Sequence, residues 1–190
     1  MKKSVNLQRS QIVISGVGGQ GVLFITRLLA EAAIMKGCQV FTSETHGMAQ
    51  RGGTVLSHLK VGDFSSPLIR PFQADGLIAL KPENILQHGS FLKKGAWIFV
   101  NSGKKPDTGF DTYAVDADAL SLKTGNPKSV NLVLLGFALK GEKVRQGENK
   151  GLFCTFEDIK SVLAGQLKGK KEMLDASVRA LETGYAVSVK

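Results

Sequence analysis

Six residues near the amino terminus, Gly16-Val17-Gly18-Gly19-Gln20-Gly21, form a pattern that could bind an anion. They fit the spacing Gly-x-Gly-x-x-Gly, in which the first glycine allows a tight turn, the second lets a ligand approach the backbone, and the third lets a helix pack closely. Backbone N–H groups and the positive end of the helix dipole then favour an anion such as pyrophosphate. The glycines could also serve only a close strand-to-helix turn. Gln20 could hydrogen-bond a ligand or hold the neighbouring loop.

A second glycine-rich segment, His46-Gly47-Met48-Ala49-Gln50-Arg51-Gly52-Gly53, follows Glu44 and Thr45. Two glycines after an arginine let the backbone fold tightly around a charged group, and the guanidinium of Arg51 offers a planar fork for phosphate or carboxylate. Arg51 could instead form an ion pair, for instance with Glu44. A lone histidine in such a loop is more often a hydrogen-bonding residue than a catalyst. No second histidine or cysteine stands at metal-ligand spacing, so we expect no zinc site.

The elements that must position these segments alternate between strand and helix. The apolar run Ile12–Ile14 predicts a buried parallel strand, and apolar residues recur at helical spacing from Val22 to Lys36 before Gly37. Further strands are expected at Val40–Thr42, Thr54–Val61, Gly76–Leu80, Ala96–Val100 and Tyr113–Val115. Helices are expected from about Pro82 to Leu92, after the cap Asp116, at Val130–Leu139, after the start at Thr155–Asp158, and at Lys170–Gly184. This order predicts an α/β, three-layer Rossmann-like domain with a largely parallel or mixed sheet and C-terminal helices.

Length and composition bound the organisation of the chain. With 190 residues and 43% hydrophobic content, it can bury one substantial core, so residues 1–190 are expected to form a single domain with a helical segment over about 129–190. No run of 18 apolar residues occurs. The start Met1–Asn6 leads directly into a strand pattern. We therefore expect a cytoplasmic protein that does not enter a membrane.

The net charge of +9 is not concentrated in a tail or stripe, and aromatic residues make up only 7%. Without an RNA-binding signature or Cys/His finger spacing, a solvated basic surface is favoured over nucleic-acid binding, which remains an alternative. Such a surface also suits a polyanionic small ligand or an acidic redox partner. Cys38 and Cys154 stand far apart, so this chain alone cannot supply four thiolates to an iron–sulfur cluster. We expect both thiols to be reduced.

The main rival function is that of a stand-alone NAD(P)-dependent dehydrogenase. A dinucleotide-binding domain needs an acidic residue at the end of its second strand for the ribose hydroxyls, and Glu44 falls near that place. Against this function, the strand runs into the segment His46–Gly53 rather than into an ordinary loop and helix.

The two glycine-rich segments together resemble a known family. The runs Ile14–Val22 and Ser43–Gly53 are similar to the gamma-type domain of pyruvate and other 2-oxoacid:ferredoxin oxidoreductases. The form His-Gly-Met-Ala-Gln most resembles the beta subunit of indolepyruvate ferredoxin oxidoreductase. The likeness continues through Asp75–Leu80 and Val100–Ser102, and the C-terminal helices are less distinctive.

The resemblance implies a shared function. Enzymes of this family decarboxylate a 2-oxoacid on thiamine diphosphate, pass electrons through iron–sulfur clusters to ferredoxin, and release an acyl-coenzyme A. The resemblance to the indolepyruvate type implies that a large alpha subunit carries the thiamine site and the clusters. This chain agrees with that division, since it lacks clustered cysteines and a thiamine-type Gly-Asp-Gly motif. The small chain, inactive alone, would complete the partner's site and help to accommodate coenzyme A for an aryl or other 2-oxoacid.

The resemblance also implies a set of residues at this shared site, without assigning a catalytic residue or a metal ligand. The phosphates of coenzyme A suit both the glycine turn and Arg51. Glu44 and His46 could orient the loop or contact the thiamine side. The implied residues are Gly16, Gly18, Gly19, Gln20, Gly21, Glu44, His46, Gln50, Arg51, Gly52 and Gly53.

Overall fold

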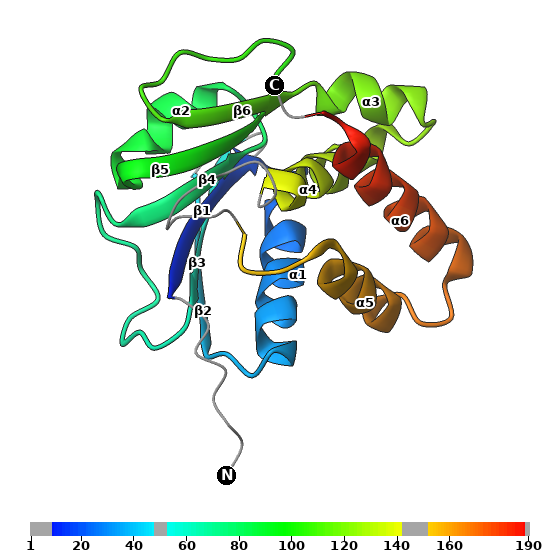
Figure 1. Cartoon of the computed structure of the whole chain (residues 1–190), viewed down its shortest axis with the longest axis horizontal. Helices are drawn as coiled ribbons and strands as arrows, with labels where there is room; N and C mark the ends of the chain where they lie inside the picture. Colours follow the sequence, from blue (N-terminus) through cyan, green and yellow to red (C-terminus); the bar gives the residue numbers. More distant parts are fainter. Residues whose placement is uncertain (1–8, 48–52, 142–151, 189–190) are drawn as a thin grey trace.

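The computed structural model describes residues 9–47, 53–141 and 152–188, which form one mixed sheet flanked by helices (Figure 1). The strand order is β2-β3-β1-β4-β5-β6. β1 runs parallel to β4, β4 to β5 and β5 to β6, whereas β3 is antiparallel to both of its neighbours. The strands are β1 Ser10–Val17, β2 Val40–His46, β3 Thr54–Val61, β4 Ala74–Ala79, β5 Leu92–Asn101 and β6 Asp111–Val115.

Helices cover both faces of the sheet and confirm the α/β fold class. Figure 1 shows α1, α4, α5 and α6 on one side of the sheet and α2 on the other. None of the helices in the described ranges is long and apolar enough to cross a membrane. The helices are α1 Val22–Met35, α2 Glu83–His88, α3 Ala117–Lys123, α4 Val130–Lys140, α5 Phe156–Gln166 and α6 Lys171–Ala186, with 3-10 turns η1 Gly89–Phe91 and η2 Pro127–Ser129. Each predicted strand and helix is present, and the remaining differences lie at element ends.

Two apolar cores lie on the two faces of the sheet, because successive side chains of a strand point to opposite sides. The larger core lies under the four-helix face, and its centre is Phe99, whose ring lies 5.2 Å from those of Trp97 and Tyr113 and 5.8 Å from that of Phe137. The smaller core lies under α2 and includes Leu77. α4 is buried on all sides, as its apolar run predicted.

Two glycines bring α4 and α6 into backbone contact. A Cβ added at Gly136 would lie 2.0 Å from the carbonyl oxygen of Leu181. A Cβ added at Gly184 would lie 1.8 Å from the carbonyl oxygen of Val133. No side chain fits at either position, so these glycines set the distance between the two helices.

The start of α5 is fixed to the end of α1. Thr155 and Asp158 form a capping box at the predicted helix start. Asp158 also accepts an ion pair from Lys36, the C-cap of α1, at 2.6 Å. Burial would raise the pKa of Asp158, but hydrogen bonds from Lys36 and Thr155 outweigh it and hold this pKa below its ordinary value. These contacts hold α5 against the helical face of the sheet.

A buried histidine on β3 makes stability depend on pH. His58 is 3% exposed, and its Nδ1 accepts the N–H of Ile69 at 3.3 Å. Burial lowers its pKa below 6.5, and the charges of His88 and Lys60 lower it further. Burial also lowers the pKa of His88. The folded chain therefore binds fewer protons than the unfolded chain below about pH 6.5.

We expect the melting temperature to be constant above about pH 7 and to fall as the pH drops from about 6.5 towards the lowered folded-state pKa values. Each kcal/mol lost should lower it by about 2–4 °C for a chain of this size. The variant His58→Asn keeps an acceptor near the position of Nδ1 without a titrating ring, so its melting curve should depend less on pH. Thermal unfolding of both proteins between pH 7.5 and 5 checks this. A wild-type melting temperature that does not fall across this range would refute the expectation.

Candidate functional site

The glycine turn Gly16–Gly21 joins the carboxyl end of β1 to the start of α1, as predicted. β3 begins beside it, because Val17 pairs with Thr54 in the antiparallel register. The N–H of Gly18 donates to the carbonyl of Gly53 at 3.0 Å. The two glycine-rich segments, distant in the sequence, are thus hydrogen-bonded neighbours at one edge of the sheet.

The described ends of the second segment both lie at this edge. β2 ends at His46, and the N–H of Gly47 donates to the carbonyl of Thr54 at 2.9 Å. Gln50, Arg51 and Gly52 lie outside the described residues, as does the side chain of His46. The anion-binding role of Arg51 stays a prediction.

Gln20 holds the glycine turn closed with its own side chain. Its Oε1 accepts the N–H of Val17 at 2.8 Å, and its backbone N–H donates to the carbonyl of Val17 at 3.0 Å. Both bonds lie within the turn itself, and the binding of a ligand by Gln20 stays a prediction. The Nε2 amide meets no acceptor in the described part of the chain, so Gln20 retains a donor for a ligand.

The glycines of the turn differ in what requires them. A Cβ at Gly16 would lie 2.9 Å from side-chain atoms of Leu80 and Val22, and Gly21 has a left-handed φ of 81°. Close contact between strand, helix and backbone accounts for these two glycines. Gly18 is different, because it is exposed and a Cβ there would meet only the carbonyl of Gly53, at 3.8 Å. Among the described residues, no close contact requires a glycine at position 18.

The start of α1 presents free donors beside the turn. Gly21 is the N-cap, no side chain caps the helix, and its first turn holds no acidic residue. Within the described ranges, the N–H groups of Val22, Leu23 and Phe24 have no acceptor. Together with the helix dipole they favour an anion at this point.

Asn131, which sequence reasoning missed, forms the floor of the turn. It is 8% exposed near the start of α4, and its Nδ2 lies 2.1 Å from the position of a Cβ on Gly21. Its Oδ1 accepts the N–H of Leu132 at 2.9 Å. The available signal was a single amide side chain at the start of an otherwise apolar helix.

A series of hydrogen-bonded polar side chains lies on the α2 side of the same edge, and the sequence patterns did not predict it. Thr54 Oγ1 lies 3.4 Å from Gln87 Oε1, which accepts Asn84 Nδ2 at 3.3 Å. Asn84 Oδ1 accepts the N–H of Lys81, an exposed cation that follows β4. The position of Lys81 directly after a parallel strand was the signal for this residue.

Glu44 does not occupy the place that a dinucleotide-binding domain requires. It is exposed on β2 and pairs in register with Ser57 of β3. β3 separates β2 from β1, so Glu44 stands two strand spacings, roughly 9.5 Å, from the strand that leads into the turn. In a dinucleotide-binding domain the acidic residue ends the strand adjacent to the first. The strand order therefore disfavours the NAD-dependent alternative.

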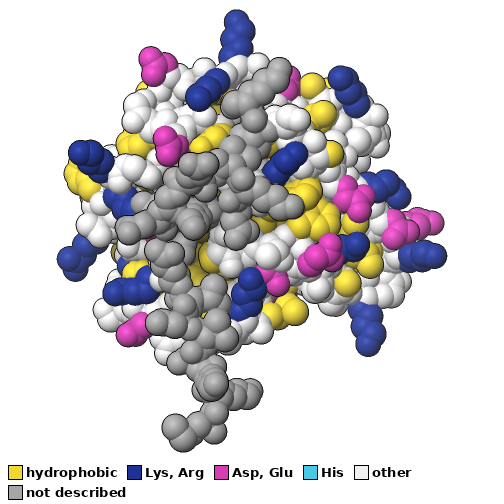
Figure 2. Space-filling model, in the orientation of Figure 1, with side chains coloured by type: hydrophobic (Ala, Val, Ile, Leu, Met, Phe, Trp, Pro, Cys, Tyr) yellow, Lys and Arg dark blue, Asp and Glu magenta, His cyan; other side chains and the backbone are white. Residues whose placement is uncertain are grey.

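The described residues on the face shown in Figure 2 carry no continuous stripe of positive charge. On the face in Figure 2, Lys and Arg side chains are dispersed and acidic side chains lie between them. This distribution fits a solvated basic surface better than a continuous nucleic-acid-binding stripe. Among the described residues, no three His, Cys, Asp or Glu side chains gather in a group that could hold a metal ion.

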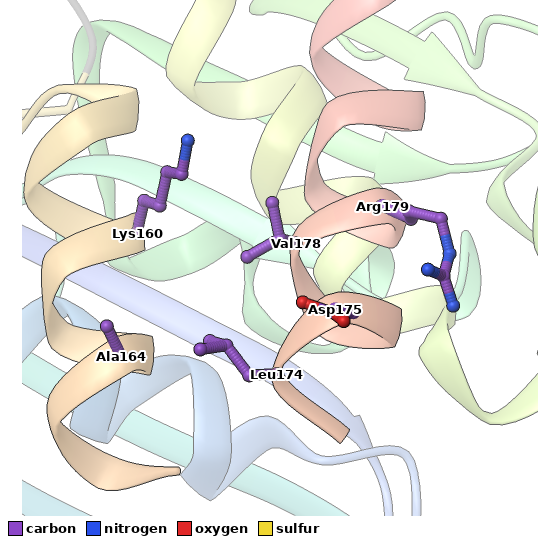
Figure 3. A pocket seen from close by; sticks show the side chains of 6 residues that line it. All are labelled: Lys160, Ala164, Leu174, Asp175, Val178 and Arg179. Atoms are coloured by element: carbon purple, nitrogen blue, oxygen red, sulfur yellow. The ribbon is translucent and has the colours of Figure 1, made fainter. Parts of the chain in front are cut away.

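A groove of about 380 Å³ lies between α5 and α6, away from the turn (Figure 3). Leu174 and Val178 point towards α5, opposite Ala164, while Arg179 points away. None of the predicted site residues lines this groove. The site at the glycine turn is therefore the one that sequence and geometry both support.

Comparison with known proteins gives consistent relatives. The family described as pyruvate ferredoxin/flavodoxin oxidoreductase matches residues 11–187. The indolepyruvate oxidoreductase subunit IorB of Archaeoglobus fulgidus is 32% identical over 199 residues, which cover 93% of this chain and 94% of that protein.

Two solved structures have the same fold. The gamma subunit of keto/oxoacid ferredoxin oxidoreductase from Geobacter sulfurreducens has a TM-score of 0.72 at 24% identity, covering 93% of this chain and 96% of its own. The 2-oxoglutarate:ferredoxin oxidoreductase from Magnetococcus marinus, solved with 2-oxoglutarate, coenzyme A and succinyl-CoA bound, has a TM-score of 0.73 at 21% identity. This likeness covers 96% of the present chain but 32% of that larger one.

Proposed function

Because the chain belongs to the pyruvate ferredoxin/flavodoxin oxidoreductase family and is a small subunit of a 2-oxoacid:ferredoxin oxidoreductase, we propose that it serves the indolepyruvate type. The complete enzyme would convert an aryl 2-oxoacid and coenzyme A into an acyl-coenzyme A and carbon dioxide, with the two released electrons passing to ferredoxin. The identity to the indolepyruvate relative over nearly the full length supports this substrate class.

The glycine turn carries the proposal for what this chain contributes. Gly18 is exposed, no close contact with a described residue requires it, and it lies beside the uncapped start of α1. The turn also holds the side-chain amide of Gln20, and Asn131 Nδ2 lies against Gly21. Such a surface suits the diphosphate of coenzyme A. Arg51, which follows in the neighbouring segment, would add a guanidinium to the same anion.

The residues present fit coenzyme A better than the other cofactors of the reaction. Coenzyme A, when bound, supplies the thiol that accepts the acyl group. An iron–sulfur cluster needs four thiolates, whereas this chain has two cysteines and Cys154 is 1% exposed in the core. We therefore assign thiamine diphosphate and the clusters to a large partner subunit, and the roles of orienting coenzyme A and closing the site to this chain.

The residues of the turn would act by keeping its shape constant. Gln20 is joined to Val17 by two hydrogen bonds across the turn, and Asn131 supports the turn from α4. A rigid array of donors costs little reorganisation when an anion arrives. Residues 1–190 would form a single domain whose C-terminal helices, over about 129–190, support the turn from behind.

The direct test is to purify the chain with its natural partner and to measure ferredoxin or viologen reduction. Indolepyruvate, pyruvate and 2-oxoglutarate are compared, each with coenzyme A. We expect reduction with indolepyruvate at the highest kcat/KM and no reduction by either subunit alone. Activity of this chain without a partner, or a clear preference for pyruvate or 2-oxoglutarate, would contradict the proposal.

The variant Gly18→Ala separates binding from folding. The added methyl would make only an ordinary contact with the carbonyl of Gly53, so the melting temperature should stay within about 2 °C of wild type. If a diphosphate rests on this backbone, the methyl should raise the KM for coenzyme A at least about tenfold, which corresponds to about 1.4 kcal/mol. Steady-state kinetics of the complex measure this.

The control is Gly89→Ala, which also places a methyl in open space but lies in η1, outside the turn. It should change neither quantity. Arg51→Ala should raise the same KM. If both Gly18→Ala and Arg51→Ala keep full activity and the wild-type KM for coenzyme A, coenzyme A does not bind at this turn.

A further inference from the structure

A second polar cavity lies at the opposite edge of the sheet from the glycine turn. Its volume is about 510 Å³, and it opens where β1 begins and β3 ends. Gln11 lines it, whereas the turn follows Val17, so the two sites are separated by most of β1, roughly 20 Å. None of the residues assigned to the proposed function lines this cavity.

Three cations line the cavity, and two of them lie over one aromatic ring. The guanidinium carbon of Arg9 lies 4.1 Å from the ring centroid of Phe64, and Nζ of Lys60 lies 5.0 Å from the same centroid. Arg70 also lines the cavity. Lys60 is only 7% exposed as a residue, so most of its side chain is shielded from water. Cation–π contact with Phe64 replaces only part of the lost hydration.

No carboxylate neutralises this cluster in the described part of the chain. The two oxygens of Asp75 are engaged elsewhere, one by the N–H of Gln11 at 2.6 Å and the other by Lys93 at 2.5 Å. The first acidic residue of the whole sequence is Glu31, so the segment before Arg9 contains no carboxylate. Burial lowers the pKa of Lys60, and the neighbouring charges of Arg70 and Arg9 lower it further.

A buried lysine with two arginines and no counter-charge is unfavourable unless an anion completes it. Two guanidinium forks and an ammonium suit a group with at least two negative charges and several acceptor oxygens. Ser65 and Ser66, which also line the cavity, add hydroxyl donors. The volume lies within the range of small-molecule sites.

We propose that this cavity binds a phosphorylated small molecule through a phosphate or diphosphate group held by Arg9, Lys60 and Arg70, with Phe64 as its apolar wall. The site is independent of the glycine turn and of coenzyme A bound there. It gives the subunit a second ligand at the far edge of its sheet.

The test uses the full-length chain and inorganic pyrophosphate as the probe. Pyrophosphate is titrated at constant ionic strength, and the dissociation constant is taken from calorimetry and from the ³¹P line width. We expect saturable binding in the wild type that weakens at least tenfold in Lys60→Met and in Arg70→Ala. The control Lys81→Met also removes one positive charge, but beside the glycine turn, and should bind like the wild type.

Thermal unfolding provides a readout that a purely structural lysine would not give. Because the folded chain lowers the pKa of Lys60, it holds the charged form unfavourably at neutral pH. The wild type should melt higher when pyrophosphate is added, and Lys60→Met should gain nothing from it. Arg70 is exposed, so Arg70→Ala should fold normally and lose only the gain from pyrophosphate.

Three results would overturn the proposal. One is no saturable binding of pyrophosphate by the wild type. Another is loss of binding in Lys81→Met but not in Lys60→Met or Arg70→Ala, which would place the anion at the turn. The third is tighter binding of citrate than of pyrophosphate, which would make the ligand a carboxylate rather than a phosphate.

Discussion

Replacing Gly184 by alanine is expected to destabilise the chain by about 3 kcal/mol or more, and to lower the melting temperature by roughly 6–12 °C. The added Cβ would lie 1.8 Å from the carbonyl oxygen of Val133 and 2.9 Å from the N of Phe137. Both atoms belong to the backbone of α4, so no rotation of a side chain can relieve the overlap. α6 must move away from α4, which opens the larger core.

A matched control is available on the neighbouring helix. Gly165 lies in α5, and a Cβ there would meet nothing within 4 Å. Because alanine is the better helix former, Gly165→Ala should be neutral or up to about 1 kcal/mol more stable. Thermal and urea unfolding of the two variants measure the difference. Equal melting temperatures for Gly184→Ala and wild type would show that the two helices are not in backbone contact.

Replacing Gly21 by valine is expected to lower the coenzyme A-dependent kcat/KM of the complex by about a hundredfold, because a displacement on the order of 1 Å in a binding element has effects of this size. This expectation rests on the proposed function. The position has a φ of 81°, which valine adopts at a cost, and its Cβ would overlap Nδ2 of Asn131, 2.1 Å away. Either the start of α1 or Asn131 must leave its place at the turn.

Gly37 at the other end of α1 is the control for backbone strain. Its φ of 79° nearly equals that of Gly21, but a Cβ there would meet nothing within 4 Å. Gly37→Val should therefore lose stability from strain alone and keep its activity. Gly21→Val should lose more stability than Gly37→Val, because its side chain also overlaps Asn131. The double variant Gly21→Val/Asn131→Ala removes this overlap and should recover part of that additional loss. If Gly21→Val and Gly37→Val have equal kcat/KM for coenzyme A, the turn does not bind coenzyme A.

Much of the fold followed from local patterns. Glycine stops, apolar periodicity and the Thr155 cap depend on neighbours within a few residues, so they predicted where the elements lie. The predicted α/β class is confirmed by the mixed sheet. The binding roles of the two glycine-rich segments, including Arg51, remain predictions.

Pairing between distant strands was not contained in those patterns. The sequence of a strand does not determine which strands lie beside it. The pattern of β3 would be the same at an edge of the sheet as in its observed place between β2 and β1. Because β3 lies between β2 and β1, Glu44 is not next to the first strand, and Gly53 is hydrogen-bonded to Gly18. The three cations also come from separate stretches of the chain, so only the assembled sheet brings them to one cavity.

The sequence by itself determined that a glycine turn joins a buried strand to a helix, because each glycine of that pattern acts on its own backbone. Only the tertiary structure decided what each glycine is for. Gly16 and Gly21 are required by contacts with Leu80 and Asn131, residues far along the chain. Among the described residues, Gly18 meets only the carbonyl of Gly53, at 3.8 Å, and its role in binding a ligand stays a prediction.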